Sequence, residues 1–399
     1  MTTVAEQVRG IEARHVLQVY KRLPLVLVRG EDSRIVDTDG REYIDFLSGI
    51  GVASLGHAHA GLAEAIAAQA RELVHTSNLF FHPLQGQVAA RLARLSGLPR
   101  AFFCNSGTEA VEACLKFARR YWHAAGSPAR TEIVAFERSF HGRTFGSLSV
   151  TSGTPYREPF APLVPGVRFV PPDDPEALRR AVSPATAAVI VEPIQGEGGV
   201  WPLSRTMADA VSSVCAQTGT LLIADEIQCG LGRTGHPFYS AVLGLRPDLM
   251  ALGKALGAGF PVGAALLSEQ VAGAVAFGDH GTTYGGNLLA CRAALVFLDA
   301  LDGGLPARVA AAGARLEAGL SKLAATRPAT GEIRGAGLMR GLELESAAAE
   351  RIVGAALERG VIVNRTAGTV VRLLPPLTIA DADIDEGLAR LAAALEDVT

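Results

Sequence analysis

The chain has 399 residues, enough for about two domains, and with 49% hydrophobic and 19% charged residues it is expected to fold around a large core. Its formal net charge of −3 provides no basic surface for nucleic acid or for an anionic membrane. The five cysteines show no C-x-x-C spacing, which disfavours a zinc site and a disulfide framework and predicts a reducing, cytoplasmic environment.

Short apolar runs alternate with amphipathic stretches through the middle of the chain. Before them, the polar first residues lack the apolar core of a signal sequence, and residues 35–44 have the pattern of a β-hairpin. Amphipathic stretches such as 109–122 and 206–217 separate several apolar runs, which predicts βαβ units and a mostly parallel sheet with ligands at the carboxyl ends of its strands. The predicted strands are 101–104, 132–136, 167–170, 187–192, 220–225, 249–252 and 262–267.

The last quarter of the chain has a different pattern. Helical stretches at 288–301 and 306–326 are followed by short strands at 337–343, 361–364 and 370–374 and by a helix at 384–395. The sequence therefore predicts an α/β fold with two domains. Residues 46–302 are expected to form the large domain and residues 303–399 a smaller α+β domain, with residues 1–45 packed against the smaller one.

One segment, residues 249–267, is nearly as apolar as a membrane span and has Lys254 as its only charged residue. Four glycines and a proline divide it into two short strands and a turn. A soluble protein is therefore expected.

Lys254 is the most informative residue of the chain, because only four of the 37 basic residues are lysines and this one has only apolar neighbours. Burial of a lysine disfavours its ammonium form and lowers its pKa. The resulting amine can bond to an aldehyde, which arginine cannot do. The alternative is a lysine that extends to solvent from the end of a strand, and this segment alone does not decide between the two interpretations.

The segment Asn105-Ser-Gly-Thr-Glu follows a predicted strand and opens a helix. Free backbone N–H groups at a helix start bind anions, and the hydroxyls of Ser106 and Thr108 add donors. The alternative is an ordinary capping box between Ser106 and Glu109, which this motif by itself favours.

Asp225 ends a predicted buried strand and is followed directly by Glu226. A carboxylate at the mouth of a parallel sheet can pair with the N–H of a pyridinium ring and so make that ring an electron acceptor. The alternatives are a magnesium ligand or a helix cap.

Three other motifs are weaker. The glycines of Gly230-Leu-Gly-Arg-Thr-Gly match a dinucleotide-binding pattern, but His236 and Pro237 interrupt the helix that it should open. Around Lys254 the phosphate-loop pattern also fails, because no serine or threonine follows the lysine. Four histidines between residues 57 and 82 lack matching carboxylates, so no metal site is predicted.

An anion site at a helix start, a carboxylate at a strand end and a desolvated lysine together fit one cofactor. Pyridoxal 5′-phosphate requires a phosphate cradle, a partner for its ring nitrogen and an amine that captures its aldehyde. The three features therefore predict a pyridoxal-phosphate enzyme.

Eight motifs in order along the chain support this prediction. They are Gly56-His-Ala-His, His75-Thr-Ser-Asn, Asn105-Ser-Gly-Thr-Glu-Ala, Phe140-His-Gly-Arg-Thr, Glu192-Pro-Ile-Gln-Gly-Glu-Gly-Gly, Asp225-Glu-Ile-Gln, Asp279-His-Gly-Thr-Thr-Tyr-Gly-Gly-Asn and Arg372-Leu-Leu-Pro-Pro-Leu. From about Tyr43 to Pro376 the chain resembles the class III pyridoxal-phosphate aminotransferases, which have fold type I. Within that family it is most similar to the acetylornithine group.

The resemblance implies a role for each matching residue around the cofactor. Lys254 would bond to its aldehyde and later carry a proton. Asp225 would pair with the ring nitrogen, Gln228 with the phenolic oxygen, and Phe140 would stack on the ring. The phosphate would be bound by Ser106, Gly107 and Thr108, and by Thr283 from a neighbouring subunit, which implies a homodimer.

The resemblance also implies how substrates are held. Arg143 and Arg372 would be two carboxylate clamps, and Glu197 would neutralise Arg372 in the first half-reaction and move away in the second. Thr282 would contact substrate. The expected activity is transfer of the δ-amino group of N²-acetyl-L-ornithine to 2-oxoglutarate, which gives N-acetyl-L-glutamate 5-semialdehyde and L-glutamate in arginine biosynthesis.

Other functions stay open at this point. Within the family the rival substrates are N-succinylornithine, ornithine, 4-aminobutyrate and carrier-linked lysine. A racemase or aminomutase on the same fold would have little use for two arginine clamps. A nicotinamide oxidoreductase would depend on the glycines at 230–235.

Overall fold

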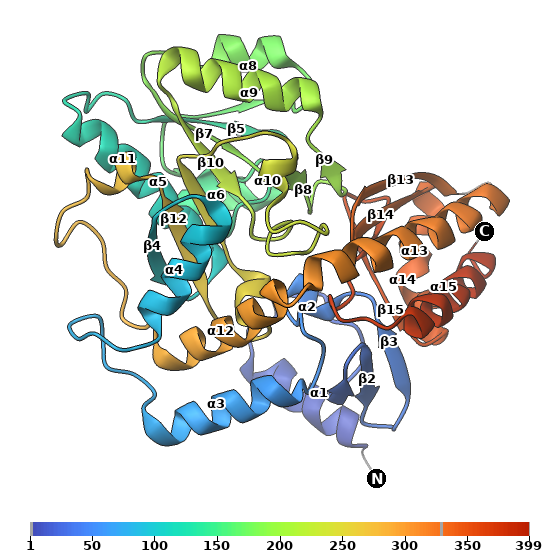
Figure 1. Ribbon diagram of the computed structural model, residues 1–399. Helices are drawn as coiled ribbons and strands as arrows, with labels where there is room; N and C mark the ends of the chain where they lie inside the picture. Colours follow the sequence, from blue (N-terminus) through green and yellow to red (C-terminus); the bar gives the residue numbers. More distant parts are fainter. Residues whose placement is uncertain (1–2, 328–329, 399) are drawn as a thin grey trace.

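The computed structural model describes residues 3–327 and 330–398. Figure 1 shows helices on both sides of a central sheet, with the two chain ends on the side of the smaller sheets. The helices are α1 (Val4–His15), α2 (Ser48–Gly51), α3 (Ala60–Glu72), α4 (Gln85–Ser96), α5 (Gly107–Ala124), α6 (Phe145–Ser149), α7 (Thr154–Arg157), α8 (Pro175–Ala181), α9 (Arg205–Thr218), α10 (Tyr239–Val242), α11 (Glu269–Ala272), α12 (Leu288–Asp302), α13 (Leu305–Thr326), α14 (Ser346–Glu358) and α15 (Asp381–Glu396), with 3₁₀ turns η1 (Glu158–Phe160) and η2 (Lys254–Gly257).

The strands of the described residues form four sheets. They are β1 (Leu27–Glu31), β2 (Arg34–Asp37), β3 (Glu42–Asp45), β4 (Arg100–Cys104), β5 (Glu132–Phe136), β6 (Val167–Val170), β7 (Thr186–Val191), β8 (Ile194–Gln195), β9 (Trp201–Pro202), β10 (Leu221–Asp225), β11 (Leu249–Leu252), β12 (Gly263–Leu267), β13 (Thr330–Ala336), β14 (Met339–Leu344), β15 (Val361–Ile362), β16 (Asn364–Thr366) and β17 (Val370–Leu373).

The central sheet has seven strands in the order β4-β12-β11-β10-β7-β5-β6. Strands β11, β10, β7, β5 and β6 are parallel to one another, whereas β12 is antiparallel to both of its neighbours. The expected α/β fold with a mostly parallel sheet is therefore confirmed. Because parallel strands end at one edge, the loops that follow them gather at that edge.

The two faces of this sheet are covered by different helices. In β5, Ile133 packs in the cluster that contains the buried residues of α5, while the next residue, Val134, packs in the cluster that contains the buried residues of α9. Successive side chains of a strand point to opposite faces, so a strand buried on both sides must be apolar throughout. All six residues of β7 are buried for this reason.

Two four-stranded sheets lie outside the central one, in the orders β1-β2-β3-β15 and β13-β14-β17-β16. The first contains the predicted hairpin, in which β2 pairs antiparallel with β3, and β3 pairs parallel with β15. A strand of the N-terminal segment therefore shares a sheet with a strand of the C-terminal part. The domain limits at residues 45/46 and 302/303 stay a prediction.

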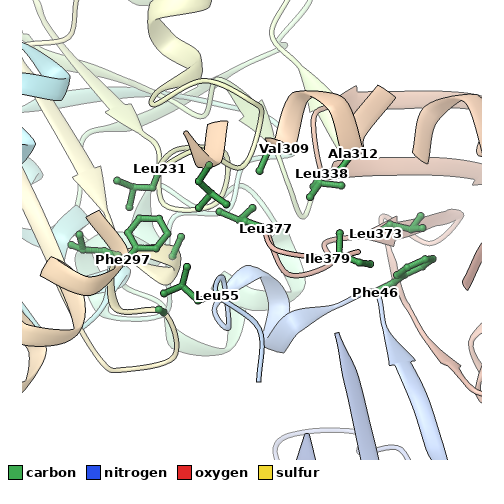
Figure 2. Packing of buried hydrophobic residues seen from close by; sticks show 14 of the residues in the cluster. Phe46, Leu55, Leu231, Phe297, Val309, Ala312, Leu338, Leu373, Leu377 and Ile379 are labelled. Carbon is green, nitrogen blue, oxygen red and sulfur yellow. The ribbon is translucent and has the colours of Figure 1, made fainter. Parts of the chain in front are cut away.

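The largest cluster of buried side chains joins these parts. Phe297 of α12 and Val309 of α13 belong to the same cluster as Phe46, which follows β3, and Leu373 of β17 (Figure 2). Leu377 in the following loop lies between them. This shared core fixes the C-terminal part of the chain relative to the loops at the edge of the central sheet.

The structure differs from the sequence prediction at two places in the C-terminal part. The strand expected at 361–364 is two strands, because the chain leaves β3 after Ile362 and joins β17 from Asn364 onward. Helix α14 and strand β13 were not predicted. Strand β13 precedes and helix α14 follows β14, which is the expected strand 337–343. Helix α14 is rich in alanine, and an alanine-rich stretch lacks the distinct apolar stripe that predicts a helix.

Among the described residues, no helix combines the length and the apolar character that crossing a membrane requires.

Candidate active site

A cavity of about 300 Å³ lies at the carboxyl edge of the central sheet. Its lining comes from the loops that follow five strands, and each loop contributes a polar or aromatic side chain. These are Ser106 after β4, Phe140 after β5, Glu192 after β7, Asp225 at the end of β10 and Lys254 after β11. The sheet thus brings together residues that lie far apart in the sequence, including three, Ser106, Asp225 and Lys254, that local patterns predicted without reference to any family.

Lys254 is the first residue of η2 and lines the cavity. Among the described residues, its Nζ atom has no hydrogen-bond or ion-pair partner. Burial lowers the pKa of Lys254 below its ordinary value, although the nearby charges of Asp225 and Glu197 act in the opposite direction. The neutral amine, which is the nucleophilic form, is therefore more populated than in an exposed lysine.

Asp225 belongs to a buried group of three titratable residues. Its Oδ2 atom lies 2.7 Å from Nδ1 of His141, and its Oδ1 atom accepts a hydrogen bond of 3.1 Å from the backbone of Ile227. Burial opposes protonation of His141, but the hydrogen bond and charge of Asp225 outweigh it and raise the pKa of the imidazole. Glu192 accepts backbone hydrogen bonds from Phe140 and Gly196, and burial raises its pKa to about 7.

The start of α5 forms one wall of the cavity. Ser106 is its N-cap, and the Oγ atom accepts a 3.3 Å hydrogen bond from the backbone of Glu109, so the capping interpretation describes a real contact. Among the described residues, the N–H groups of Gly107 and Thr108 have no acceptor, as expected for the first turn of a helix. Capping by Ser106 and anion binding by these N–H groups are therefore compatible.

Close packing keeps this wall free of side chains. A Cβ atom on Gly142 would lie 2.2 Å from Oγ1 of Thr108, and one on Gly107 would lie 2.9 Å from Ile227. Gly253, which precedes the lysine, approaches Gly107 so closely that its Cβ would lie 3.1 Å from the backbone of that residue. The helix start and the lysine-bearing turn therefore face the same small space.

Arg372 lies behind the lining of the cavity. Its side chain is completely buried, and Nη1 donates to Glu197 and, at 3.1 Å, to Oε1 of Gln228. Glu197 and Gln228 themselves line the cavity. Burial opposes ionisation of Glu197, but the charge and hydrogen bond of Arg372 outweigh it and lower the pKa of the carboxyl group. Nη2 of Arg372 is buried and has no partner among the described residues.

The remaining predicted site residues lie at the mouth of the cavity or outside it. Arg143 lines the cavity but is exposed, on the loop between β5 and α6. Thr282 and Thr283 do not line it; they line a neighbouring cavity of about 580 Å³, where Nδ2 of Asn105 lies 3.5 Å from Oγ1 of Thr282. In a single chain these two threonines are thus separated from Lys254.

The residues around the cavity fit pyridoxal phosphate: an amine, a strand-end carboxylate and a row of unpartnered N–H groups beside glycines surround one space. The model of the aminotransferase class-III family matches residues 16–395 of the chain. The chain belongs to this family.

Known members are similar over nearly the whole chain. The acetylornithine aminotransferase of Methanocaldococcus jannaschii is 44% identical over 376 residues, which cover 94% of each chain. A crystal structure of N-acetylornithine aminotransferase from Stenotrophomonas maltophilia has a TM-score of 0.84 at 35% identity and covers 97% of this chain and 98% of its own. An amine transaminase from an uncultivated Pseudomonas species, solved with bound pyridoxal phosphate, has a TM-score of 0.90 at 32% identity and covers 96% and 97%.

Membership confirms the expected family, the enzyme class and its pyridoxal-phosphate cofactor. Two members of the buried group, His141 and Glu192, belong to the class III aminotransferase motifs, but neither was predicted to have a role. Only their separation from their partners explains this: His141 is 84 positions from Asp225, and no local pattern predicts that the two side chains meet.

Proposed function

We propose that this class III aminotransferase transfers the δ-amino group of N²-acetyl-L-ornithine to 2-oxoglutarate. The amine becomes N-acetyl-L-glutamate 5-semialdehyde and the keto acid becomes L-glutamate. The observation that carries the proposal is a cavity with Lys254 inside it and two arginines at its periphery, one exposed and one paired with a glutamate. Both proposed substrates carry a carboxylate remote from the reacting atom, and one of them also carries a carboxylate beside it.

When bound, pyridoxal phosphate supplies an aldehyde carbon that takes up amino groups and a ring that accepts electrons. In the proposed arrangement, the Nζ atom of Lys254 would hold the cofactor through that carbon and, once the substrate amine has taken its place, would serve as the amine that carries a proton. Asp225 keeps the ring nitrogen protonated, because a carboxylate within the buried group favours a positive charge beside it.

The other cofactor contacts are also proposed. Gln228 would donate to the phenolic oxygen of the cofactor and Phe140 would cover one face of its ring. Ser106, Gly107 and Thr108 would hold the phosphate through backbone N–H groups and hydroxyls at the start of α5. Reduction of the holoenzyme with borohydride followed by peptide mapping tests the whole arrangement. The label is expected on the peptide that contains Lys254, and a label elsewhere would contradict it.

Glu197 would adapt the site to two different substrates. In the first half-reaction no carboxylate lies near the reacting carbon, and Glu197 neutralises Arg372, which would otherwise be a buried unpaired cation. In the second, the carboxylate next to the ketone of 2-oxoglutarate takes that position. Glu197→Gln is therefore expected to slow the amine half-reaction more than the glutamate half-reaction, and equal effects in rapid-mixing experiments would argue against this role.

A substrate panel tests the choice of amine. We expect the highest kcat/KM with N-acetylornithine among N-acetylornithine, N-succinylornithine, ornithine and 4-aminobutyrate, with 2-oxoglutarate as acceptor. A higher value for any of the other three would replace the proposed substrate while leaving the family unchanged.

We also propose a homodimer in which Thr283 of one subunit reaches the phosphate of the other and Thr282 contacts the substrate. Large apolar side chains at 79–81, at Phe277 and at Tyr284 are exposed in the single chain, as expected for a surface that a second copy covers. Thr283 also lines no part of the cavity of its own chain. Sedimentation should give twice the mass of 41.6 kDa. Inactive Lys254→Ala chains can be mixed with weakened Thr283→Ala chains. In the proposed hybrid dimer, one site carries both substitutions and the other carries neither, so the activity per subunit that retains Lys254 should change.

We also propose a cytoplasmic location. All five cysteines are buried and unpaired, which suits a reducing compartment. Cell fractionation that recovers the protein in a membrane or secreted fraction would contradict it.

A further inference from the structure

Among the residues that the structure describes, Arg143 has no ionic partner. Its guanidinium lines the mouth of the cavity, and among the described residues no carboxylate lies within salt-bridge distance and no side-chain hydrogen bond restrains it. An exposed arginine without a partner samples many rotamers, so its position must be fixed by other contacts if it is to bind a substrate at a defined place.

Two aromatic rings supply such contacts. The Cζ atom of Arg143 lies 3.7 Å from the ring centroid of Tyr156 and 5.5 Å from that of Phe140. The two rings are nearly perpendicular, with an interplanar angle of 86° and centroids 6.4 Å apart. They therefore form a corner around the guanidinium, and the shorter contact is with Tyr156.

The position of Tyr156 is itself fixed by the short helix α7. Its backbone N–H donates a 3.0 Å hydrogen bond to Gly153, the N-cap of this helix. A Cβ atom on Gly153 would lie 2.8 Å from Cδ2 of the tyrosine, so the ring rests directly against the glycine backbone. Tyr156 also lines a second cavity of about 610 Å³ that shares Phe140 and Glu197 with the first.

Stacking differs from ion pairing in one respect that matters for binding. A ring on its face occupies none of the five N–H donors of a guanidinium, whereas a carboxylate partner occupies two of them. An arginine held by stacking is fixed in place and still fully able to bind an anion.

We propose that Tyr156 is a positioning residue that holds the Arg143 guanidinium across the mouth of the cavity, so that the enzyme selects amines and keto acids with a carboxylate remote from the reacting atom. The inference rests on the proposed transamination of N-acetylornithine. It adds a specificity-determining residue outside the eight motifs and identifies the substrate feature that the residue selects.

The test compares Tyr156→Leu with wild type in single-turnover half-reactions of the holoenzyme, in which even a slow substrate gives a rate constant and an apparent Kd. N-Acetylornithine is paired with N-acetylputrescine, which is the same amine without the carboxylate. We expect Tyr156→Leu to raise the apparent Kd for N-acetylornithine about tenfold with little change in the maximal rate, and to leave both constants for N-acetylputrescine unchanged.

Two further variants separate positioning from general damage. Tyr156→Phe keeps the ring and should behave as wild type. Phe145→Leu removes an aromatic residue that is 63% exposed, lies two positions from Arg143 and makes no ring contact with it among the described residues, so it should also behave as wild type. Equal loss with both amines in Tyr156→Leu, or no loss with either, would overturn the inference. Failure of the wild-type enzyme to react with N-acetylornithine would instead overturn the proposed function.

Discussion

The floor of the cavity and its mouth are built in opposite ways. The floor, which consists of Lys254, Asp225, His141 and Glu192, contains titratable groups that lie close together away from water. The mouth depends on Arg143, an exposed cation held by an aromatic ring. Charges that are shielded from water act strongly on one another, whereas a stacked, exposed cation contributes little energy. The difference indicates that chemistry depends on all of the floor residues at once, while recognition at the mouth can change one residue at a time.

The largest effect should come from the floor. Lys254→Ala removes the amine that bonds to the cofactor and moves the proton, so turnover should fall by more than about 10⁴-fold while the protein still binds pyridoxal phosphate. Steady-state assays and absorbance titration with the cofactor measure the two properties. Lys322→Ala, at an exposed lysine, is the control. Substantial residual turnover in Lys254→Ala would contradict the assignment of the chemical step to the floor of the cavity.

Replacing the floor carboxylate should have the next largest effect. Asp225→Asn keeps the shape but loses the charge that stabilises a protonated ring nitrogen, so kcat should fall by about 10²- to 10³-fold. The matched control is Asp248→Asn, whose carboxylate accepts a 2.9 Å hydrogen bond from Leu222 far from the cavity lining. If both variants lose activity to the same extent, the effect belongs to the fold and not to the site.

At the mouth, Arg143→Lys should have a smaller effect than either change on the floor. Lysine keeps the positive charge but loses the planar fork that binds a carboxylate with two hydrogen bonds. KM for N-acetylornithine and for 2-oxoglutarate should rise about tenfold with kcat nearly constant, as measured in steady-state assays. A large fall in kcat would mean that Arg143 contributes to the chemical step, as the floor residues are expected to do.

The smallest expected effect is on stability. Because burial raises the pKa of Glu192 to about 7, the folded protein holds this proton at pH values where the unfolded chain has released it. The folded state then binds more protons between about pH 4.5 and 7, and its stability falls as the pH rises through this range. In urea unfolding, the free energy of unfolding of Glu192→Gln should fall less with rising pH than that of the wild type. The difference in this free energy, variant minus wild type, should therefore increase by on the order of 1–3 kcal/mol between pH 5 and pH 8. Parallel curves for the two proteins would mean that His141 or Asp225 carries the proton instead.

Local sequence patterns predicted which strands form the floor of the site, but not the contacts between its charged side chains. Strands 132–136 and 249–252 were predicted with the observed limits, because a strand buried on both faces is an uninterrupted apolar run. Because strand 249–252 pairs parallel with β10, which ends at Asp225, Lys254 and Asp225 lie at the same edge of the sheet. The contact between His141 and Asp225 depends instead on the path of a loop, and no periodicity in the sequence encodes it.

The mouth was predicted less completely. Arg143 was found through a family motif, but Tyr156 lies on a four-residue helix outside all eight motifs. The proposed role of Tyr156 depends on the distance between its ring and the Arg143 guanidinium. The C-terminal part shows the same limit on a larger scale. The chain changes sheets between Ile362 and Asn364, and that change is set by which strand is available for pairing, not by the intervening valine.

The backbone of Lys254 has one more consequence. Its φ angle of +39° lies in the left-handed region, where a residue with a Cβ atom is strained by about 1 kcal/mol or more and glycine is not. Random mutation to glycine at this position would therefore relax the chain while abolishing catalysis. A laboratory selection for thermal tolerance alone would tend to inactivate the enzyme here, and only a screen that also requires turnover would retain the lysine.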